Sequence, residues 1–201
     1  RMSHELRTPR HAVIGVAQLL AADDALRRHA VARERVGHIR AAGQHLLALV
    51  DDVLDLSSLD AGAAPLESCR LPLRDAFDAV LPMVAAQADA AGVMIACGGL
   101  DHAVQADPTR LRQILLNLLT NAIKYNRHGG RVDISTSPEA NQIVIAVSDT
   151  GRGMNAEQLA HVFEPFNRLG VEREGIEGTG IGLAIVKLNV ERMGGGVSVS
   201  S

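Results

Sequence analysis

A break in composition near residue 61 limits what this chain can fold into more than any other feature does. The residues before it carry helical patterns and no strand signal. A short segment rich in glycine, alanine and proline follows, and beyond it strand and helix patterns alternate. We therefore expect an all-helical domain at 1–60, a linker at 61–66 and an α/β domain at 67–201. Since 47% of the 201 residues are hydrophobic, the chain can build at least one buried core.

The helical part carries two seams with coiled-coil spacing. The first seam includes one arginine and consists of Leu6, Arg10, Val13, Ala17 and Leu20. The second seam consists of Val36, Ile39, Gly43, Leu46, Val50 and Val53. Together they predict an antiparallel helical hairpin with its turn near 23–29. Because two helices cannot bury both seams alone, we expect a homodimer that forms a four-helix bundle.

The second part predicts an α/β sandwich in which helices cover one face of a mixed or antiparallel sheet, so the fold class of the whole chain is α+β. We expect helices at 73–91, from residue 108 onward and at 181–193, and strands at 93–96, 131–137 and 142–149. Asp107 followed by Pro108 is a typical helix start. The core stripe of that helix is predicted to be Leu111, Leu115, Leu118 and Ala122.

Charge, aromatic content and cysteine spacing argue against several classes of protein. A net charge of −3 and only four aromatic residues argue against a nucleic-acid partner. Cys69 and Cys97 form no C-x-x-C pair, which argues against a disulfide scaffold and a zinc site and favours a reducing, cytoplasmic setting. The longest uncharged stretch, 11–22, is shorter than the ~20 residues that cross a bilayer, so we expect no membrane contact by this part of the protein.

The two ends of the sequence suggest a piece of a longer protein. The chain opens inside a helical pattern with no signal peptide and closes on an unfinished strand-like run at 196–201. The sequence leaves open whether the whole protein is anchored in a membrane.

The face of the first helix opposite its seam carries a histidine suited to phosphoryl transfer. By helical spacing His4 points to solvent, and the neighbouring carboxylate of Glu5 can hold its imidazole as the neutral tautomer with one ring nitrogen free. Thr8 lies one turn further, close enough to position a water against a group attached to that ring. An ordinary surface histidine is the alternative interpretation.

A polar stripe follows the helix that begins at Pro108. Asn117, Asn121 and Lys124 are spaced by four and three residues, and the other side of this helix is core. Amide oxygen suits the coordination shell of Mg²⁺ and an ammonium group suits phosphate, so the stripe fits a phosphate chain with its metal ion. A solvated helix face explains the spacing alone equally well.

A carboxylate at a strand end is a further candidate. Asp149 follows Ile143, Ile145 and Val147 on one face of a strand, so we expect it on the buried side, where a donor from a ligand would relieve its cost. A turn or cap at the strand end is the alternative interpretation.

Two glycine clusters flank a predicted mobile lid. Gly151 and Gly153 allow close approach of the backbone to a ligand, and the glycines at 178–182 lead into a helix whose N–H groups suit phosphates. The residues between the clusters include two aromatic rings and two cations that could lie over phosphates, namely Phe163, Phe166, Arg168 and Arg173.

Taken together, five segments resemble the sequence boxes of the sensor histidine kinases of bacterial two-component systems. SHELRTP at 3–9 resembles the phosphoacceptor box, and NLLTNAIKY at 117–125 resembles the asparagine box. DTGRG at 149–153, FEPF at 163–166 and GTGIG at 178–182 resemble the first glycine, phenylalanine and second glycine boxes. The resemblance implies a dimerisation and phosphotransfer hairpin followed by an ATP-binding domain of the gyrase, Hsp90, histidine kinase and MutL type.

The resemblance also implies roles for individual residues. Asp149 receives the adenine amino group, Tyr125 covers the adenine, Asn121 ligates Mg²⁺ and Lys124 meets phosphate. The expected ATP-binding set further includes Asn117, Gly151, Gly153, Arg168, Arg173, Gly178, Thr179, Gly180, Gly182 and Leu183. Three features depart from the family pattern: Arg10 on the seam, His11 in place of the common asparagine, and the absence of the final strand with its signature.

The function that the resemblance implies is an ATP-dependent protein histidine kinase. It would phosphorylate His4 and pass the phosphoryl group to an aspartate on the receiver domain of a response regulator. Residues 5–8 fit the family's E-x-x-T phosphatase pattern, so dephosphorylation of the regulator is expected as well.

Two alternatives remain beside the kinase. An ATPase clamp of the same nucleotide fold is expected to carry a glutamate at position 117 as the base for water, whereas the amide of Asn117 cannot take that proton. A dimeric signalling scaffold without catalysis would usually show damage in the boxes, and none is seen at His4, Asn121, Asp149 or the glycines.

Overall fold

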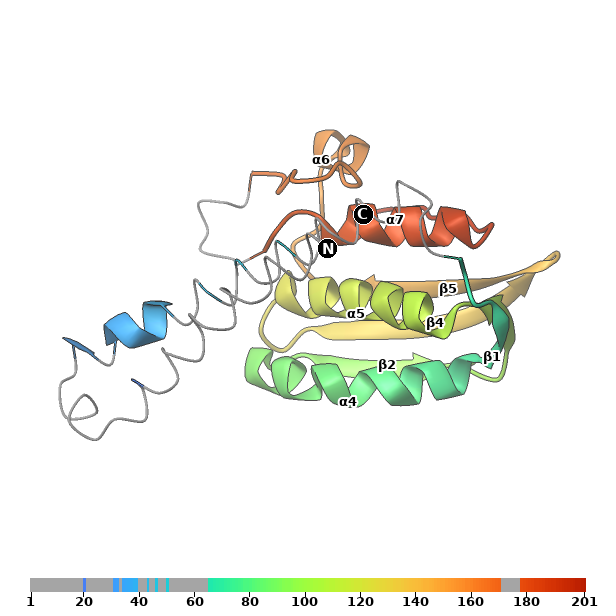
Figure 1. Ribbon diagram of the computed structural model, residues 1–201, viewed down its shortest axis with the longest axis horizontal. Coiled ribbons are helices and arrows are strands. Elements are labelled where there is room, and N and C mark those ends of the chain that lie inside the picture. The colour runs from blue at the N-terminus through green and yellow to red at the C-terminus, as the bar shows by residue number, and fades with distance from the viewer. Residues whose placement is uncertain are drawn as a thin grey trace.

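The computed structural model describes residues 65–170 and 178–201 continuously (Figure 1). Among the first sixty residues it describes only 20, 31, 32, 34–39, 43, 46 and 50, and all of these are helical. The predicted turn at 23–29, Arg10, the trio His4, Glu5 and Thr8, and the lid residue Arg173 lie outside the described residues. Within the described part, no helix combines the length and the apolar character needed to cross a membrane.

From residue 65 onward the strands form two sheets. The smaller sheet pairs β1 (Cys69–Pro72) with β3 (Ala103–Ala106) in antiparallel fashion. The larger sheet has the order β2 (Met94–Gly98), β4 (Arg131–Glu139) and β5 (Gln142–Asp149). Because β2 runs parallel to β4 and β4 runs antiparallel to β5, this sheet is mixed, which is one of the two arrangements that the sequence left open.

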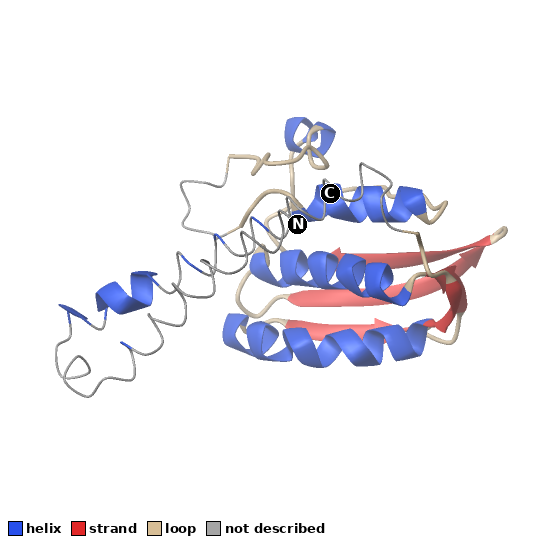
Figure 2. Ribbon diagram, viewed as in Figure 1, coloured by secondary structure: helices blue, strands red, loops and turns tan. Residues whose placement is uncertain are grey.

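Helices cover one face of the larger sheet (Figure 2). They are α4 (Leu73–Ala91) and α5 (Pro108–Lys124), with α7 (Gly182–Arg192) packed beside α5. The short α6 (Ala156–Ala160) belongs to the segment between the two glycine clusters. The α+β class is therefore confirmed.

The ends of α4 and α5 follow from their capping residues. Asp107 Oδ1 accepts hydrogen bonds from the N–H groups of Thr109, at 2.9 Å, and Arg110, at 3.1 Å, and Pro108 is the first helical residue. Burial of the Asp107 carboxyl raises its pKa, but backbone N–H bonds from Arg110, Glu67 and Thr109 outweigh that effect and leave the pKa lowered. Helix α4 ends at Gly92, whose φ of 66° is left-handed, so its predicted bounds are confirmed.

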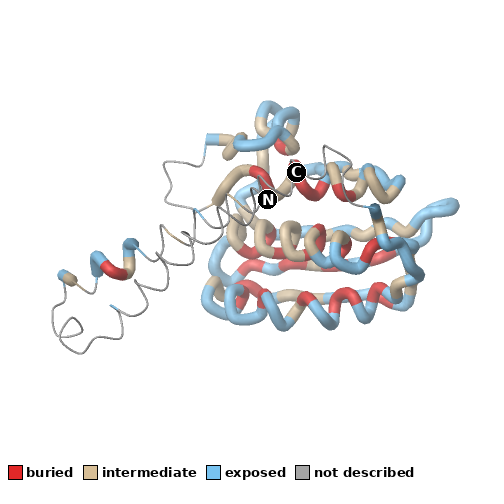
Figure 3. The backbone as a smooth tube through the Cα atoms, in the orientation of Figure 1, coloured by how far each residue is buried: buried red, intermediate tan, exposed pale blue. Residues whose placement is uncertain are grey.

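The main core lies between α4, α5 and the inner face of the larger sheet (Figure 3). The predicted core stripe of α5 was wrong at one position, because Leu118 is only half-buried. Ile114, Leu119 and Ile123 are buried instead, along with Leu111, Leu115 and Ala122. The reason is that α5 packs against α4 and α7 as well as the sheet, so its buried arc is wider than a single stripe and is turned relative to it.

The strand predictions need three corrections. The sequence pattern predicted neither β1 nor β3, because each has only four residues and no alternation of buried and exposed positions. The β4–β5 hairpin extends to Glu139 and Gln142, whereas the first of its strands was predicted to end at residue 137, so Pro138 pairs with Ile143 within the sheet. Residues 196–201 form no strand, and β5 is an edge strand of its sheet.

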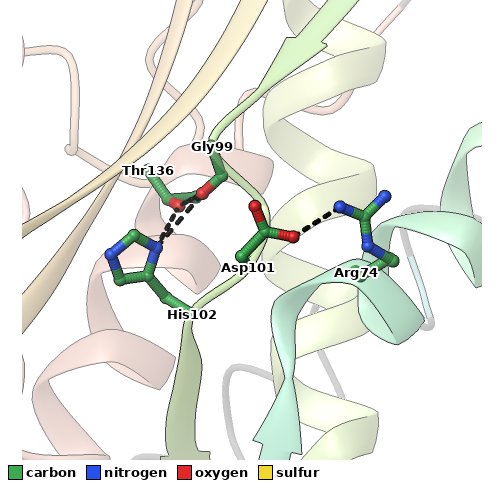
Figure 4. A network of polar contacts seen from close by, with 5 residues as sticks. All are labelled: Arg74, Gly99, Asp101, His102 and Thr136. Carbon is green, nitrogen blue, oxygen red and sulfur yellow. Dashed lines mark hydrogen bonds and ion pairs between the residues drawn. The ribbon is translucent and has the colours of Figure 1, made fainter.

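A polar network fixes the loop between β2 and β3 (Figure 4). The buried hydroxyl of Thr136 on β4 donates a hydrogen bond to the carbonyl of Gly99. His102 Nδ1 lies 3.2 Å from that carbonyl, and Arg74 Nη2 lies 2.6 Å from Asp101 Oδ1. These contacts tie the loop to β4 and to the first turn of α4.

Candidate active site

Helix α5 presents its polar stripe toward the start of α7. Asn117, Asn121 and Lys124 are all half-buried. Asn117 Nδ2 donates a hydrogen bond to the carbonyl of Gly182, at 3.3 Å, and a Cβ built on Gly182 would lie 3.5 Å from Asn117 Oδ1. The stripe is therefore not a solvated helix face, because it lies against the second glycine cluster.

The last turn of α5 brings a cation, an aromatic ring and a glycine together. Lys124 Nζ donates a hydrogen bond to Tyr125 Oη, at 3.0 Å, and lies 4.6 Å from the centre of the Tyr125 ring. A Cβ on Gly178 would overlap with Lys124 Nζ, so only glycine fits there without movement of the lysine. Three predicted ATP-binding residues from two distant segments thus meet at one point.

The first glycine cluster packs on the carboxyl end of α5. A Cβ on Gly151 would lie 2.5 Å from the backbone oxygen of Tyr125 and 2.6 Å from Asp149 Oδ1. The N–H of Gly151 donates to Asp149 Oδ1, at 2.8 Å, and the N–H of Arg152 donates to the oxygen of Tyr125, at 3.2 Å. The backbone after β5 therefore approaches Tyr125 as closely as a residue without a side chain allows.

Asp149 does not lie on the buried side as predicted. The alternation along β5 is correct, because Ile143, Ile145 and Val147 are half-buried and pack against the main core. Asp149 is the last residue of the strand and is exposed, since the core ends before it. Its Oδ1 accepts the Gly151 N–H, and the exposed carboxylate retains capacity for a further donor.

The second glycine cluster opens α7. Thr179 Oγ1 accepts a hydrogen bond from the N–H of Ile181, at 3.3 Å, and no side chain in the described part of the chain caps the first turn of the helix. Gly180 has a left-handed φ of 73°, and a Cβ there would lie 3.0 Å from the backbone carbon of Phe166 and 3.1 Å from Arg168 Cγ. The uncapped N–H groups of an eleven-residue helix suit an anion, and the lid residues Phe166 and Arg168 lie beside them.

Two family models match this chain. One, described as "Histidine kinase-, DNA gyrase B-, and HSP90-like ATPase", matches residues 106–201, and the other, the His Kinase A (phospho-acceptor) domain, matches residues 1–62. The chain belongs to the histidine kinase family. The matches include all the glycine clusters, the α5 stripe and the segment that contains His4.

Similar proteins include named histidine kinases. The cell-division control histidine kinase PdhS of Brucella abortus is 36% identical over 95% of this chain, and histidine protein kinase DivJ of Caulobacter vibrioides is 34% identical over all of it. A crystal structure of full-length ShkA in complex with AMPPNP has a TM-score of 0.81 and 35% identity over the whole chain. The chain spans 20% of PdhS, 34% of DivJ and 42% of the ShkA chain.

The predicted lid of this member of the histidine kinase family contains a polar cluster that the sequence did not reveal. His161 Nδ1 lies 2.7 Å from Glu164 Oε1, and Asn167 Nδ2 donates to Glu164 Oε2, at 3.0 Å. The hydrogen bond to Glu164 raises the pKa of His161, and the same bond, followed by that from Asn167, lowers the pKa of Glu164. Phe166 is 59% exposed and has a left-handed φ of 63°, which is rare for a residue with a large side chain.

The residues present fit a Mg²⁺ ion carried by phosphates. Among the described residues, no group of three or more histidine, cysteine or acidic side chains could hold a metal ion. The side-chain amide of Asn121 has no hydrogen bond to another described residue and lies on the stripe between Asn117 and Lys124. Mg²⁺ commonly takes one or two oxygen ligands from the protein and the rest from phosphates and water, which matches a single amide oxygen.

The structure brings most of the predicted residues to one place. The contacts described above link six of them: Asn117, Lys124, Tyr125, Gly151, Gly178 and Gly182. Thr179, Gly180 and Leu183 are their neighbours along the chain, and Arg168 lies beside Gly180. Gly153 is separate, because its closest neighbour is Ser201 Oγ, which also accepts the N–H of Met154 at 2.7 Å. Sequence reasoning missed Asn126 and Thr150, whose contact spans 24 residues and leaves no local pattern.

Proposed function

We propose that this chain is the kinase core of an ATP-dependent protein histidine kinase that phosphorylates His4 and transfers the phosphoryl group to an aspartate of a response regulator. The observation that carries the proposal is the meeting of Lys124, Tyr125 and Gly178 beside the backbone of the first glycine cluster. A site for a nucleotide needs an aromatic face, a cation and accessible backbone N–H groups. Tyr125 and Lys124 supply the first two, and the first turn of α7 supplies the N–H groups. The complex of ShkA with AMPPNP supports the same ligand class.

ATP would lie with its base at the end of β5 and its phosphates at the start of α7. The exposed carboxylate of Asp149 accepts a hydrogen bond from the adenine amino group, while the Tyr125 ring covers the base. Lys124, now bonded to Tyr125 Oη, turns its ammonium to the phosphates, where the uncapped N–H groups of α7 also point. Because Gly178 has no side chain, Lys124 can keep its present position beside Tyr125 until a nucleotide binds.

Asn121 would supply the protein's ligand to Mg²⁺. The ion neutralises part of the phosphate charge when bound. Asn121 is the amide of the stripe that would be available for this, because the amide of Asn117 is engaged with the carbonyl of Gly182.

The acceptor of the phosphoryl group would be His4. Its free ring nitrogen attacks the γ-phosphorus, so that a nitrogen–phosphorus bond forms and the bond from that phosphorus to the bridging oxygen of ADP breaks. The other ring nitrogen gives its proton to Glu5, which leaves a neutral phosphorylated imidazole. An aspartate of the response regulator then takes the phosphoryl group from His4.

Thr8 would serve the reverse signal, the dephosphorylation of the regulator. A hydroxyl one helical turn from His4 can orient a water toward the aspartyl phosphate of a docked regulator. It has no part in the transfer from ATP to His4. Thr8→Ala should therefore reduce the phosphatase rate and leave self-phosphorylation near the parent rate.

A homodimer with a cytoplasmic location completes the proposal, with domains divided at the linker 61–66. Three residues of the predicted seams, Leu20, Ile39 and Leu46, are 38%, 48% and 56% exposed in the single chain. A second copy that forms a four-helix bundle would cover these side chains. The receiver domain of the regulator is the second proposed partner.

The ATPase clamp is the weaker candidate for this site. Its water-activating base would stand at position 117, where the amide of Asn117 instead donates to the carbonyl of Gly182. That contact gives the residue a role in holding α7, and an amide cannot act as the base for water. A silent scaffold is disfavoured because the contacts among Lys124, Tyr125 and Gly178 are intact.

The chemical stability of the product tests the proposal. After incubation with labelled ATP and Mg²⁺, we expect label on the protein that is lost in acid and survives base, as a phosphoramidate does. His4→Gln should abolish the label while ATP affinity by calorimetry stays near that of the parent. Label retained by His4→Gln, or label stable to acid, would refute the assignment of His4.

A further inference from the structure

We propose that Asn126 is a positioning residue for the nucleotide site, acting through Thr150 to hold Asp149 at a fixed place relative to helix α5. The inference rests on the proposed function, because it assumes that Asp149 binds the adenine amino group. Asn126 directly follows Tyr125, the C-cap residue of α5, and Thr150 directly follows the last residue of β5. The pair thus joins the two elements that carry the phosphate half and the adenine half of the site.

The side-chain amide of Asn126 uses its full hydrogen-bonding capacity. Its Nδ2 donates to the carbonyl of Ala122 in the last turn of α5 and to the carbonyl of Arg131 at the start of β4, both at 3.1 Å. Its Oδ1 accepts from the N–H of Arg127, at 3.0 Å, and from the hydroxyl of Thr150, at 3.2 Å. A carboxamide can make four such bonds, so no other side chain of similar size would satisfy all four partners.

Thr150 carries the connection to Asp149. Its hydroxyl accepts the N–H of Arg131, at 2.9 Å, while it donates to Asn126, and its own N–H donates to the carbonyl of Arg131, at 3.1 Å. These bonds continue the β4–β5 pairing by one residue beyond Asp149, which pairs with Val132. Without them Asp149 would be the frayed last residue of an edge strand.

The turn after α5 is shaped around the Asn126 side chain. A Cβ on Gly130 would overlap with Asn126 Oδ1 and lie 2.8 Å from the carbonyl of Arg127. The N–H of Asn126 bonds to the carbonyl of Ile123, at 3.2 Å, which fixes where its side chain leaves the helix. A glycine at 130 is therefore part of the same arrangement.

The arrangement predicts a specific effect on ligand selection. A carboxylate that accepts from the amino group of adenine discriminates against guanine, which carries a carbonyl at that ring position. Discrimination depends on the location of the carboxylate relative to the Tyr125 ring, and Tyr125 directly precedes Asn126. Since Thr150 is exposed, water can replace its hydrogen bonds at small cost in stability, whereas water cannot restore the position of Asp149.

A matched pair of substitutions at position 150 tests the proposal. Thr150→Val keeps the shape and removes the hydroxyl, while Thr150→Ser keeps the hydroxyl. ATP and GTP affinities of the whole chain are measured by calorimetry for both variants and for Asn126→Ala, each in the parent and in an Asp149→Asn background. Thermal unfolding without nucleotide is recorded for all of them.

If Asn126 positions Asp149, Thr150→Val and Asn126→Ala each weaken ATP binding by about tenfold, the scale of one lost bond to a charged group, and narrow the ratio of ATP to GTP affinity. Thr150→Ser restores both. In the Asp149→Asn background, Thr150→Val causes little further loss, because the contact that it serves is already gone.

Three results would each decide against a stated claim. Parent-like ATP affinity in Thr150→Val, with weak binding by Asp149→Asn, overturns the inference and leaves the proposed function standing. The same loss from Thr150→Val in both backgrounds also overturns it, since the hydroxyl would then act independently of Asp149. Parent-like ATP binding by Asp149→Asn removes the proposed adenine contact itself.

Discussion

Replacing Gly151 by alanine should damage both stability and ATP binding, for a reason that is visible in its surroundings. A Cβ at position 151 would lie 2.5 Å from the backbone oxygen of Tyr125, whereas ordinary contacts begin at 3.4 Å, so the two backbones would have to separate by about 0.9 Å. The obstacle is the end of α5 and cannot rotate away as a flexible side chain can. Overpacking of this kind costs about 1–3 kcal/mol.

At about 4 °C for each kcal/mol in a domain of this size, Gly151→Ala should lower Tm by about 4–12 °C. The same separation moves Asp149 away from Tyr125, so ATP affinity should fall by about tenfold or more, as after loss of a bond to a charged group. Thermal unfolding without nucleotide and calorimetric titration with ATP measure the two effects.

Gly182→Ala is the matched control for unfolding. A Cβ there would lie 3.5 Å from Asn117 Oδ1, an ordinary contact, and alanine favours the helix by up to about 1 kcal/mol over glycine. Its Tm should equal or exceed that of the parent. If Gly151→Ala unfolds at the parent temperature and binds ATP as tightly as the parent, the close contact between residue 151 and the backbone of Tyr125 does not limit which residue fits there.

Three further predictions concern residues outside the nucleotide contacts. Asn189→Leu should raise the free energy of unfolding by about 1–2 kcal/mol, because Asn189 is fully buried and its Oδ1 has no partner among the described residues. Within the same residues its Nδ2 donates only one long bond, 3.3 Å, to Gln113 Oε1, which also accepts from Arg110. A chemical denaturation curve that shows lower stability would contradict this. Asp107→Ala should lower the free energy of unfolding by about 1–2 kcal/mol through loss of the α5 cap, while Asp107→Ser retains most of it; equal losses in both would exclude the cap as the cause. Because the pKa of His161 is raised and that of Glu164 is lowered, the pair stabilises the predicted lid most between pH 4.5 and 6.5. Above this window the stabilisation is lost as His161 loses its proton, and below it the stabilisation is lost as Glu164 gains one. Glu164→Gln should therefore return the pKa of His161, followed by NMR, toward its ordinary value of 6.5, and an unchanged titration would show that Glu164 is not the cause.

Local chemistry explains which elements could be predicted from sequence. The start of α5 was predictable because Asp107 and Pro108 act within one turn, and the end of α4 because Gly92 directly follows the helical pattern and can adopt the left-handed conformation that ends a helix. The small sheet of β1 and β3 was not, because its pairing joins residues more than thirty positions apart with little burial. Leu118 was misplaced because spacing gives the direction of a stripe and cannot give the width of the surface that neighbouring helices cover.

Part of the candidate site could likewise be predicted from sequence, and part of it could not. The stripe of Asn117, Asn121 and Lys124 was predictable from helical spacing, while its partners were not, since they come from glycines some sixty residues away. The predicted face of β5 was correct for Asp149, but its predicted burial was wrong. Alternation along a strand assigns a residue to a face and does not show where the core ends. The contact between Asn126 and Thr150 depends on the register of β4 with β5, which only the assembled sheet defines.

Helix α5 sets the geometry of the whole site. Between Asn117 and its C-cap Tyr125, about 12 Å along the helix axis at 1.5 Å per residue, it contacts α7 through Asn117 and the first glycine cluster through Tyr125. The positions of the adenine half and the phosphate half of the proposed ATP site therefore both depend on this one helix, whose start is fixed by Asp107. A substitution in a glycine cluster should weaken contacts in its own half, whereas one that shifts α5, without touching the ligand, should weaken adenine and phosphate contacts together.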